Sequence, residues 1–198
     1  MVLTAGRRAR RRGTIVLAAL LVALVLLATY LTITLRYKLD HGNVWANPQA
    51  LSSATAGPYH EYRYLAQPGR TIEYGFSIAN RGPFTVRLED VVKEGGPGFI
   101  VEQVYMNVAV HKGFQRGTAA PFKPIDLRPD DQIGVWVTMR FSDDFLLNYT
   151  TPCGGFSFEA QPVRFTVLGR QREQSVPIGY FISVTTPDAN GRPCRSDG

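Results

Sequence analysis

The sequence TIVLAALLVALVLLATYLTITL runs from Thr14 to Leu35, and it contains no charged residue, no proline and no glycine. Together with Gly13 it makes 23 residues, which as a helix rising about 1.5 Å per residue would be roughly 34 Å long. The hydrocarbon core of a bilayer is about 30 Å thick, and inside it a chain must satisfy its own backbone polar groups. We therefore expect a transmembrane α-helix over residues 14–36, with the lipid bilayer as its partner from Thr14 to Leu35.

The charges that flank this run predict its orientation in the membrane. The segment RRARRR at residues 7–12 holds five arginines, whereas only Arg36 and Lys38 follow the run closely. An excess of Lys and Arg beside a spanning segment marks its cytoplasmic side. Residues 1–13 are accordingly expected to be an Arg-rich cytoplasmic tail, and the chain from about residue 40 onward is expected to be extracytoplasmic.

A cleaved signal peptide is the alternative interpretation of the same N-terminus. Such peptides have an apolar core of about 7–15 residues, followed by an Ala-x-Ala-like cleavage site. Here the apolar run is longer, and Ala28-Thr29-Tyr30 has no second small residue. The sequence favours an uncleaved signal anchor, and hence a single-pass protein of the plasma membrane.

The basic character of the chain is concentrated around the apolar run. The sequence has 22 Lys and Arg against 16 Asp and Glu, a formal net charge of +6. Seven of these cations lie at or before Lys38, so residues 39–198 hold 15 cations and all 16 acids, a balance of −1. A nucleic-acid surface needs its Lys and Arg clustered on the binding domain itself. We therefore expect no nucleic-acid partner, and we interpret the arginine run as an orientation signal that is attracted to anionic lipids.

The residues that follow the apolar run divide into two parts. Residues 37–58 show no sustained periodicity and are rich in Ala, Ser, Gly, Asn and Pro, a composition typical of a linker. We expect a stalk at 37–58, which would include His41, and a folded extracytoplasmic domain at 59–198. A domain of this size is large enough to have its own hydrophobic core.

Residues 59–198 show the period-two alternation of β-strands, separated by turns rich in Gly and Pro. Residues 99–110 are rich in β-formers, but they do not assign one clean face to the core. Seven or so short strands with no amphipathic helix between them predict an all-β fold, an immunoglobulin-like antiparallel β-sandwich, with a barrel as the second possibility. A parallel sheet is not expected, because nothing resembles a crossover helix. The clearest alternating faces are Ile72, Tyr74, Phe76 and Ile78, and Ile133, Val135, Val137, Met139 and Phe141.

Two motifs resemble elements of bacterial immunoglobulin-like domains. TIEYGFSIANRGPFTVRLEDV, from residue 71, looks like two paired strands joined by an Asn-x-Gly-Pro turn. IDLRPDDQIGVWVTMRF, from residue 125, resembles their Leu-x-Pro-Gly-Asp/Glu turn and the strand after it, with Asp130 where Gly is usual. With its N-terminal anchor the chain is similar to uncharacterised single-pass membrane-anchored proteins of the actinobacterial type. The resemblance spans roughly residues 60–186, and it implies a fold without implying an activity.

The sequence has two cysteines, Cys153 and Cys194, both on the predicted outer side. Oxidising compartments favour disulfides. A bridge between them would close a loop of about 40 residues, for which chain entropy alone contributes roughly 4 kcal/mol. We expect this intramolecular disulfide; two free thiols or an intermolecular bridge are the alternatives.

A second similarity is architectural only. The copper chaperone of cytochrome oxidase assembly also joins one N-terminal span to an immunoglobulin-like domain, but that family carries a Cys-x-Cys pair, and here Cys153 is followed by two glycines. Met106, His111, Met139 and Cys153 are the soft ligands that folding could bring together. Because Met139 lies on a strongly apolar strand face, core packing is the expected role for it. We predict no metal site and no cofactor.

No catalytic motif stands out in the sequence. There is no Gly-x-Ser-x-Gly elbow, and Gly95-Gly96-Pro97-Gly98 is not followed by the Lys-Ser/Thr of a phosphate loop. No His-x-His or Cys-x-x-Cys spacing supports zinc. We therefore expect that the protein is not an enzyme.

Binding residues are expected in two long loops, His111 to Pro124 and Ser142 to Pro152, because loops on a rigid scaffold often carry function. The same apolar side chains could instead cover the edge of the core. The sequence predicts a membrane-anchored binding or scaffolding module of the cell envelope, with an envelope protein as its partner; extracytoplasmic copper handling or assembly of a respiratory complex is the alternative. The candidate binding residues are Phe114, Phe122, Phe145, Leu146 and Tyr149.

Overall fold

A computed structural model describes residues 4–43, 52–56, 59–67, 69–92, 99–108, 116–142 and 151–194. The chain forms two compact units, Met1–Tyr37 and Lys38–Gly198. The first unit is helical and the second is built of β-strands.

The first unit consists of one long helix, α1 (Thr4–Arg36), whose 33 residues are helical without interruption. The predicted helix over residues 14–36 is therefore present. It begins earlier than expected, because the Arg- and Ala-rich segment before Thr14 is a good helix former and continues it. Within α1, the 22 residues Ile15–Arg36 have a mean hydropathy of 2.7, so this helix is long and apolar enough to cross a membrane by length and composition.

Apolar side chains are exposed all around α1. The exposed fraction is 68 % for Ile15, 65 % for Leu24 and 62 % for Val25. The hydroxyl groups in the helix are satisfied locally, since Thr29 Oγ1 donates to the Val25 carbonyl oxygen at 2.8 Å. A helix that is apolar on every side needs an apolar environment around it.

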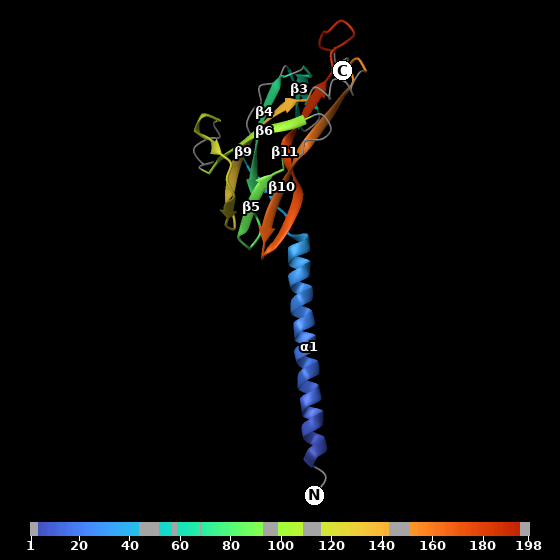
Figure 1. The fold of residues 1–198 in the computed structure, drawn as a ribbon, viewed down its shortest axis with the longest axis vertical. Coiled ribbons are helices and arrows are strands. Elements are labelled where there is room, and N and C mark those ends of the chain that lie inside the picture. Colours follow the sequence, from blue (N-terminus) through green and yellow to red (C-terminus); the bar gives the residue numbers. More distant parts are fainter. Residues whose placement is uncertain are drawn as a thin grey trace. The chain divides into compact units, whose positions relative to one another are not determined.

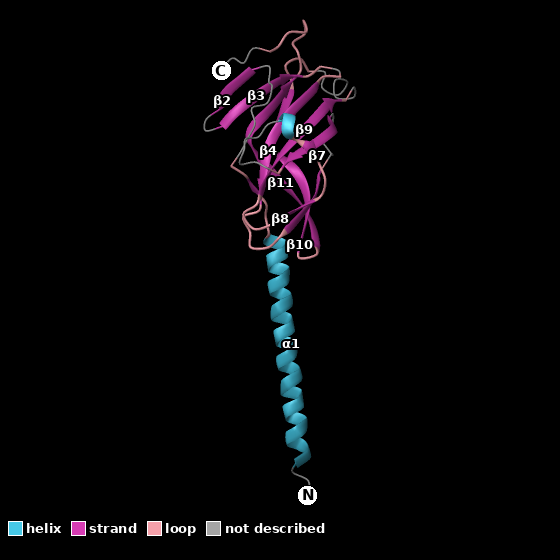
Figure 2. Ribbon diagram, turned by 90° about the vertical axis from the view of Figure 1, so that its left-hand side faces the viewer, coloured by secondary structure: helices cyan, strands magenta, loops and turns pink. Residues whose placement is uncertain are grey.

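The second unit contains two β-sheets (Figures 1 and 2). One has five strands in the order β1-β4-β9-β6-β7, and the other has six in the order β2-β3-β11-β10-β5-β8. The all-β sandwich predicted from the alternating pattern is confirmed. The strands are β1 (Asp40–His41), β2 (Ser52–Ala56), β3 (Tyr59–Leu65), β4 (Thr71–Ala79), β5 (Val86–Val91), β6 (Phe99–Asn107), β7 (Ala120–Pro121), β8 (Ile125–Leu127), β9 (Gln132–Phe141), β10 (Gly155–Val167) and β11 (Arg170–Thr185), with a short 3₁₀ turn η2 (Arg116–Thr118) before β7.

The inward faces of the central strands form the core. The predicted alternating faces of β4 and β9 are buried, and Phe76, Ile78, Val135 and Phe141 have no exposed surface. From the other sheet, β10 and β11 contribute the residues that face them. Their fully buried side chains are Val163, Phe165, Val167, Val176, Ile178, Ile182 and Val184.

The long hairpin of β10 and β11 dominates the second sheet (orange to red in Figure 1). Its turn is two residues, Leu168 and Gly169, both with positive φ, 49° and 78°. Two positive φ angles suit the tight turns that match the twist of paired strands. Residues 169–173 contain Gly169 and four polar or charged residues, from which the sequence predicts a break between two strands; this prediction is wrong for residues 170–173, which belong to β11.

One strand pair departs from the predicted antiparallel arrangement. β3 and β11 are parallel, with Glu61 opposite Phe181 and Leu65 opposite Thr185. No crossover helix is needed, because the chain between β3 and β11 forms strands of the five-stranded sheet before it returns to the six-stranded sheet. The expectation that no strands would be parallel is wrong for this pair.

The segment at 37–58, predicted to be a stalk, carries two strands. The prediction of a linker without regular structure is therefore wrong for the described residues of this segment. β1 pairs with β4, and β2 pairs with β3 along the edge of the second sheet. A two-residue strand and the Ser- and Ala-rich β2 lack the apolar alternation that identifies a strand in sequence. Their places are set by the strands beside them.

Asn80 joins the two sequence motifs that resemble immunoglobulin-like elements. It is fully buried, and its Nδ2 donates to the carbonyl oxygens of Phe84 at 2.8 Å and Leu127 at 2.9 Å. Its backbone N–H donates to Asp131 O at 2.9 Å, and its carbonyl accepts from Asp130 N at 2.7 Å. The Asn-Arg-Gly-Pro turn is thereby held against the turn that precedes β9.

Candidate functional site

The predicted binding residues are only partly described. Phe114, Phe145, Leu146 and Tyr149 lie outside the described residues. Phe122 lies between β7 and β8, where it is half-buried and its backbone N–H donates to the Val104 carbonyl oxygen at 2.9 Å. Phe122 is therefore attached to β6, the strand beside β7.

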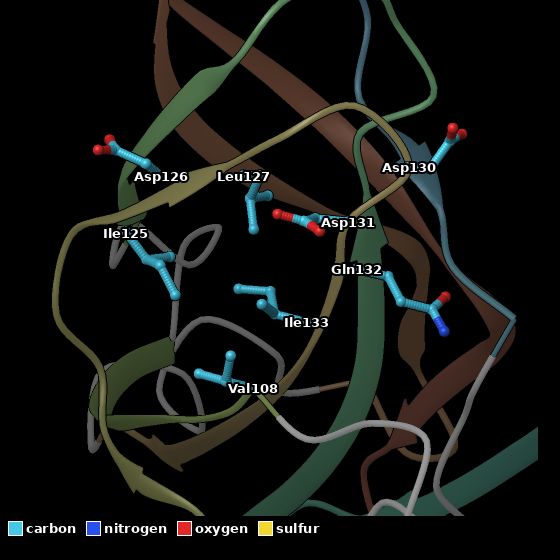
Figure 3. A pocket seen from close by; sticks show the side chains of 8 residues that line it. All are labelled: Val108, Ile125, Asp126, Leu127, Asp130, Asp131, Gln132 and Ile133. Carbon is cyan, nitrogen blue, oxygen red and sulfur yellow. The ribbon is translucent and has the colours of Figure 1, made fainter.

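A hollow of about 140 Å³ lies beside this connection, where β8 approaches the start of β9 (Figure 3). Its floor is formed by four apolar side chains: Leu127 and Ile133 are buried, Ile125 is half-buried, and Val108 is 58 % exposed. Four polar residues complete the lining, and most of the accessible surface of the hollow is polar. Figure 3 shows the four apolar side chains turned toward one another. We call this feature the β8 hollow. The residues that line it are Val108, Ile125, Asp126, Leu127, Asp130, Asp131, Gln132 and Ile133.

The three aspartates of the β8 hollow differ in their roles. Asp131 Oδ2 accepts a hydrogen bond from Arg128 N at 2.8 Å and so caps the turn. Asp126 lies 3.3 Å from Arg87 Nη1, in an exposed ion pair. The Asp130 side chain points away from the floor, and its backbone has φ of 66°. The three separated carboxylates are not arranged around a common cation.

A second apolar feature is a cluster of aromatic rings that connects the two sheets. Phe99 of β6 lies 5.3 Å from Phe141 of β9 and 4.7 Å from Phe156 of β10, measured between ring centroids. Phe158 lies 5.6 Å from Tyr74 in an edge-to-face arrangement. Phe141 is buried, whereas Phe99, Phe156 and Phe158 are half-buried. The ring cluster thus presents partly exposed aromatic rings that come from both sheets.

The disulfide expected between Cys153 and Cys194 is present, with an S–S distance of 2.01 Å and Cα atoms 5.6 Å apart. Backbone hydrogen bonds accompany it: Thr186 N donates to Gly154 O at 2.8 Å, and Cys153 N donates to Pro187 O at 3.3 Å. The bridge therefore joins the turn before β10 to the segment after β11.

The soft-ligand set considered from sequence is not assembled among the described residues. Cys153 is in the disulfide, so it does not supply a thiolate in this state. Met139 is 4 % exposed in the core, as expected, and His111 lies outside the described residues. Within the described ranges, no three His, Cys, Asp or Glu side chains lie close enough together to hold a metal ion.

The strongly shifted titratable groups are buried tyrosines, and they have structural partners. Burial raises the pKa of Tyr64, Tyr74 and Tyr180 far above the usual 10. Tyr74 donates its hydroxyl to Gln161 Oε1, and Gln161 Nε2 donates to Val92 O at 3.0 Å. These neutral hydroxyls connect the two sheets, and they do not form an acid–base pair at a surface.

One titratable residue was assigned to the stalk and lies elsewhere. His41 is in β1, inside the sandwich unit, and burial lowers the pKa of its imidazole although a hydrogen bond to the backbone of Ile178 opposes this shift. The β8 hollow and the ring cluster were also not predicted. The alternation of Phe156 and Phe158 was a usable signal for the cluster, whereas no local pattern indicated the hollow or the place of His41.

No protein family model matches the sequence, and a comparison with curated proteins finds no match. Among solved structures, similar folds include the Vibrio cholerae VesB protease (TM-score 0.36, 9 % identity, covering 80 % of this chain and 34 % of that chain). A family 123 glycoside hydrolase from Clostridium perfringens has a TM-score of 0.32 at 8 % identity over 65 % of this chain and 23 % of its own. The ASH/PapD-like domain of human CEP192 has a TM-score of 0.30 at 12 % identity, over 65 % of this chain and 82 % of its own. The chain thus spans about a third of the VesB protease and about a quarter of the glycoside hydrolase, and no functional argument rests on these distant likenesses.

Proposed function

We propose that this protein is a single-pass membrane protein whose N-terminus is cytoplasmic and whose β-sandwich is an extracytoplasmic binding or scaffolding module of the cell envelope. The observation that carries the proposal is the order of two features along one chain. An apolar helix, Ile15–Arg36, comes first, and a disulfide-bonded sandwich follows it.

The helix supports membrane anchoring through its exposed apolar surface. Side chains such as Leu20 and Leu26 are 62 % and 65 % exposed, and exposing so many of them to water is unfavourable. The arginines of residues 7–12 precede this surface, and cations beside a span favour the cytoplasmic side. The uncleaved anchor, as opposed to a cleaved signal peptide, is part of the proposal.

The disulfide supports an extracytoplasmic site for the sandwich. Disulfides persist in oxidising compartments and are rare where thiols are kept reduced. The bridge between Cys153 and Cys194 and the orientation expected from the arginines therefore agree with each other.

A binding role, without catalysis, is the activity that the described surface supports best. The β8 hollow combines four apolar side chains with four polar ones, and the ring cluster presents half-buried aromatic rings, of the kind that contribute strongly to protein interfaces. The loop residues Phe114, Phe122, Phe145, Leu146 and Tyr149 remain candidates for the same contact. The proposed partner is another protein of the envelope.

Site-specific photo-crosslinking in living cells tests this function. Val108, at the β8 hollow, and Ile100, at the other end of β6, are both apolar and exposed, by 58 % and 44 %, so they form a matched pair. A photo-reactive residue at position 108 is expected to give one discrete crosslinked envelope protein that position 100 does not give, and Val108→Arg is expected to abolish its recovery from membranes. The absence of crosslinks at both positions, together with turnover in a panel of hydrolase substrates by the purified full chain, would refute a binding role.

A further inference from the structure

Residues 39–43 form a short segment that we call the entry strap, because it is the first part of the sandwich unit after the helix. On one side it pairs with β4: Asp40 is opposite Ala79, and His41 is opposite Ile78. The pairing continues with Gly42 N, which donates to Ser77 O at 2.9 Å. The entry strap therefore forms the edge of the five-stranded sheet.

The same segment is also held by the other sheet. The side-chain amide of Gln174, in β11, forms hydrogen bonds with both the backbone N–H and the backbone carbonyl of Leu39. Leu39 N donates to Gln174 Oε1 at 2.9 Å, and Gln174 Nε2 donates to Leu39 O at 2.7 Å. Because Leu39 is 1 % exposed, these bonds replace water on a buried backbone. The entry strap bridges the two sheets.

His41 of the entry strap also lies against β11. Its ring lies over Gly179, where an added Cβ would be 2.8 Å from His41 Nε2 and 3.1 Å from Cε1. Gly179 also has φ of 88°, a conformation that favours glycine. The ring thus occupies space that exists because residue 179 has no side chain.

One nitrogen of this ring is buried without a hydrogen-bond partner. Nε2 has no partner among the described residues, while the imidazole bonds to the backbone of Ile178. In the neutral ring Nε2 can be the unprotonated nitrogen. Leaving this acceptor without a hydrogen bond costs a moderate amount of free energy. Protonation would place an N–H donor and a positive charge at the same buried point, and a buried donor without an acceptor is costly.

Few charges surround the ring to stabilise a cation. On β4, residues 77–79 are uncharged, and on β11 the one titratable neighbour is Tyr180, whose hydroxyl donates to Gly75 O. On the entry strap itself, Asp40 is exposed, and Lys38, just before the strap, is a cation. At its far end, Arg81 Nη2 donates to Asn43 Oδ1 at 3.1 Å and adds positive charge.

We propose that His41 is a pH-sensitive latch: the neutral imidazole holds the entry strap on β11 at Gly179, and protonation of the ring releases the strap. The latch depends on this geometry alone. If the proposed topology holds, the latch responds to the pH outside the cell. If the topology is wrong, the latch is still expected to work in the purified protein.

The direction in which pH changes the strap follows from the lowered pKa of His41. Burial lowers the pKa of His41 below the usual 6.5, so the open strap binds a proton more readily than the closed strap. The closed state is fully favoured above about pH 6.5, and it weakens as the pH falls from there toward the lowered pKa. For a single proton, the closing equilibrium constant falls by no more than about tenfold for each pH unit in this window.

Two measurements on the full chain in neutral-lipid nanodiscs test the latch. The first is an NMR titration of the His41 ring, whose pKa is expected to lie below the usual 6.5. The second is amide hydrogen exchange at pH 7.5 and 5.0, corrected for intrinsic rates. Protection at residues 39–43 is expected to fall with acidification, while protection in the β4–β9 ladder stays constant.

His41→Gln and His60→Gln form the matched pair of variants. Removing the ring at 41 is expected to abolish the pH dependence of strap protection, whereas the change at 60 is expected to leave it as in the wild type. If the His41→Gln variant does not fold, the wild-type titration still decides the question. A pKa of His41 at or above the usual 6.5, or strap protection that is the same at both pH values, would overturn the proposal.

Discussion

The hydroxyl of Tyr180 in β11 donates a hydrogen bond to the carbonyl oxygen of Gly75 in β4, 2.8 Å away, and accepts one from the Gly75 N–H at 3.2 Å. One side chain of the six-stranded sheet thereby satisfies both backbone groups of a residue in the five-stranded sheet. Tyr180 is 1 % exposed, so no water is available to replace these bonds. The contact fixes the two sheets against each other at the centre of the core.

Tyr180→Phe is expected to lower the free energy of unfolding by about 1–3 kcal/mol, because it leaves a buried N–H and C=O without partners. Urea unfolding of the full chain in detergent, followed by tryptophan fluorescence, measures this change. Tyr105→Phe is the control, since the Tyr105 hydroxyl contacts Gln103 at an exposed position and its loss is expected to cost less than about 0.5 kcal/mol. Equal effects of the two variants would contradict the role of Tyr180.

Asn80→Ala is expected to destabilise the sandwich by about 2–4 kcal/mol, because it removes the donors to Phe84 O and Leu127 O in a fully buried site. Asn190→Ala, in an exposed turn near the C-terminus, is the matched control and is expected to change stability by less than about 0.5 kcal/mol. The same urea titration compares them. A loss at Asn80 no larger than at Asn190 would show that the two turns hold together without this side chain.

Removing the disulfide with Cys153→Ser and Cys194→Ser is expected to cost about 2–4 kcal/mol, because the bridge closes a separation of 41 residues in the unfolded chain. The hydrogen bonds between Gly154 and Thr186 should keep the native fold at neutral pH. In the wild type, a thiol-reactive probe is expected to label nothing after denaturation without reductant and two sites after reduction. Labelling of either cysteine before reduction would contradict an intramolecular bridge.

Glu61 connects the parallel pair β3 and β11. Its Oε2 accepts from Arg63 Nη2 at 2.7 Å, and its Oε1 accepts from Ser183 Oγ at 2.6 Å. These hydrogen bonds, first that of Arg63 and then that of Ser183, hold the pKa of the Glu61 carboxyl below the usual 4.5. Because the folded-state pKa is lowered, the stabilisation is present above about pH 4.5 and is lost as the pH falls through the lowered value.

Glu61→Gln is therefore expected to cost about 1 kcal/mol at pH 7, and the gap between variant and wild type is expected to shrink toward pH 3. Denaturant titrations at the two pH values give this comparison. Glu173→Gln, which affects an exposed pair with Arg164 at 3.4 Å, is the control and should have a much smaller effect. A gap for Glu61→Gln that is as large at pH 3 as at pH 7 would exclude the ionised carboxylate as its source.

The parts of the fold that could be predicted are those in which local pattern and burial agree. The apolar run of α1 and the alternating faces of β4 and β9 have one clean periodicity each, and all were correctly predicted. In β6 no face could be assigned, and the structure gives the reason: the register with β9 shifts between Val101 and Gln103. Such a bulge moves later side chains to the opposite face.

The candidate sites were harder to predict, because they depend on contacts between distant segments. The β8 hollow combines Val108 at the end of β6 with residues of β8 and β9. His41 lies in a two-residue strand whose partner on β11 is a glycine about 140 positions later, so neither residue signals the other. Of the predicted loop residues, Phe122 alone is among those described.

The side of the membrane on which the sandwich lies is the claim on which the proposed function depends. The most direct measurement is protease treatment of right-side-out spheroplasts, with detection of an epitope placed after Gly198 and, in parallel, of a cytosolic marker protein. The account predicts that protease removes the epitope and spares the marker. An epitope that is protected until the membrane is dissolved would place the sandwich in the cytoplasm and contradict the account.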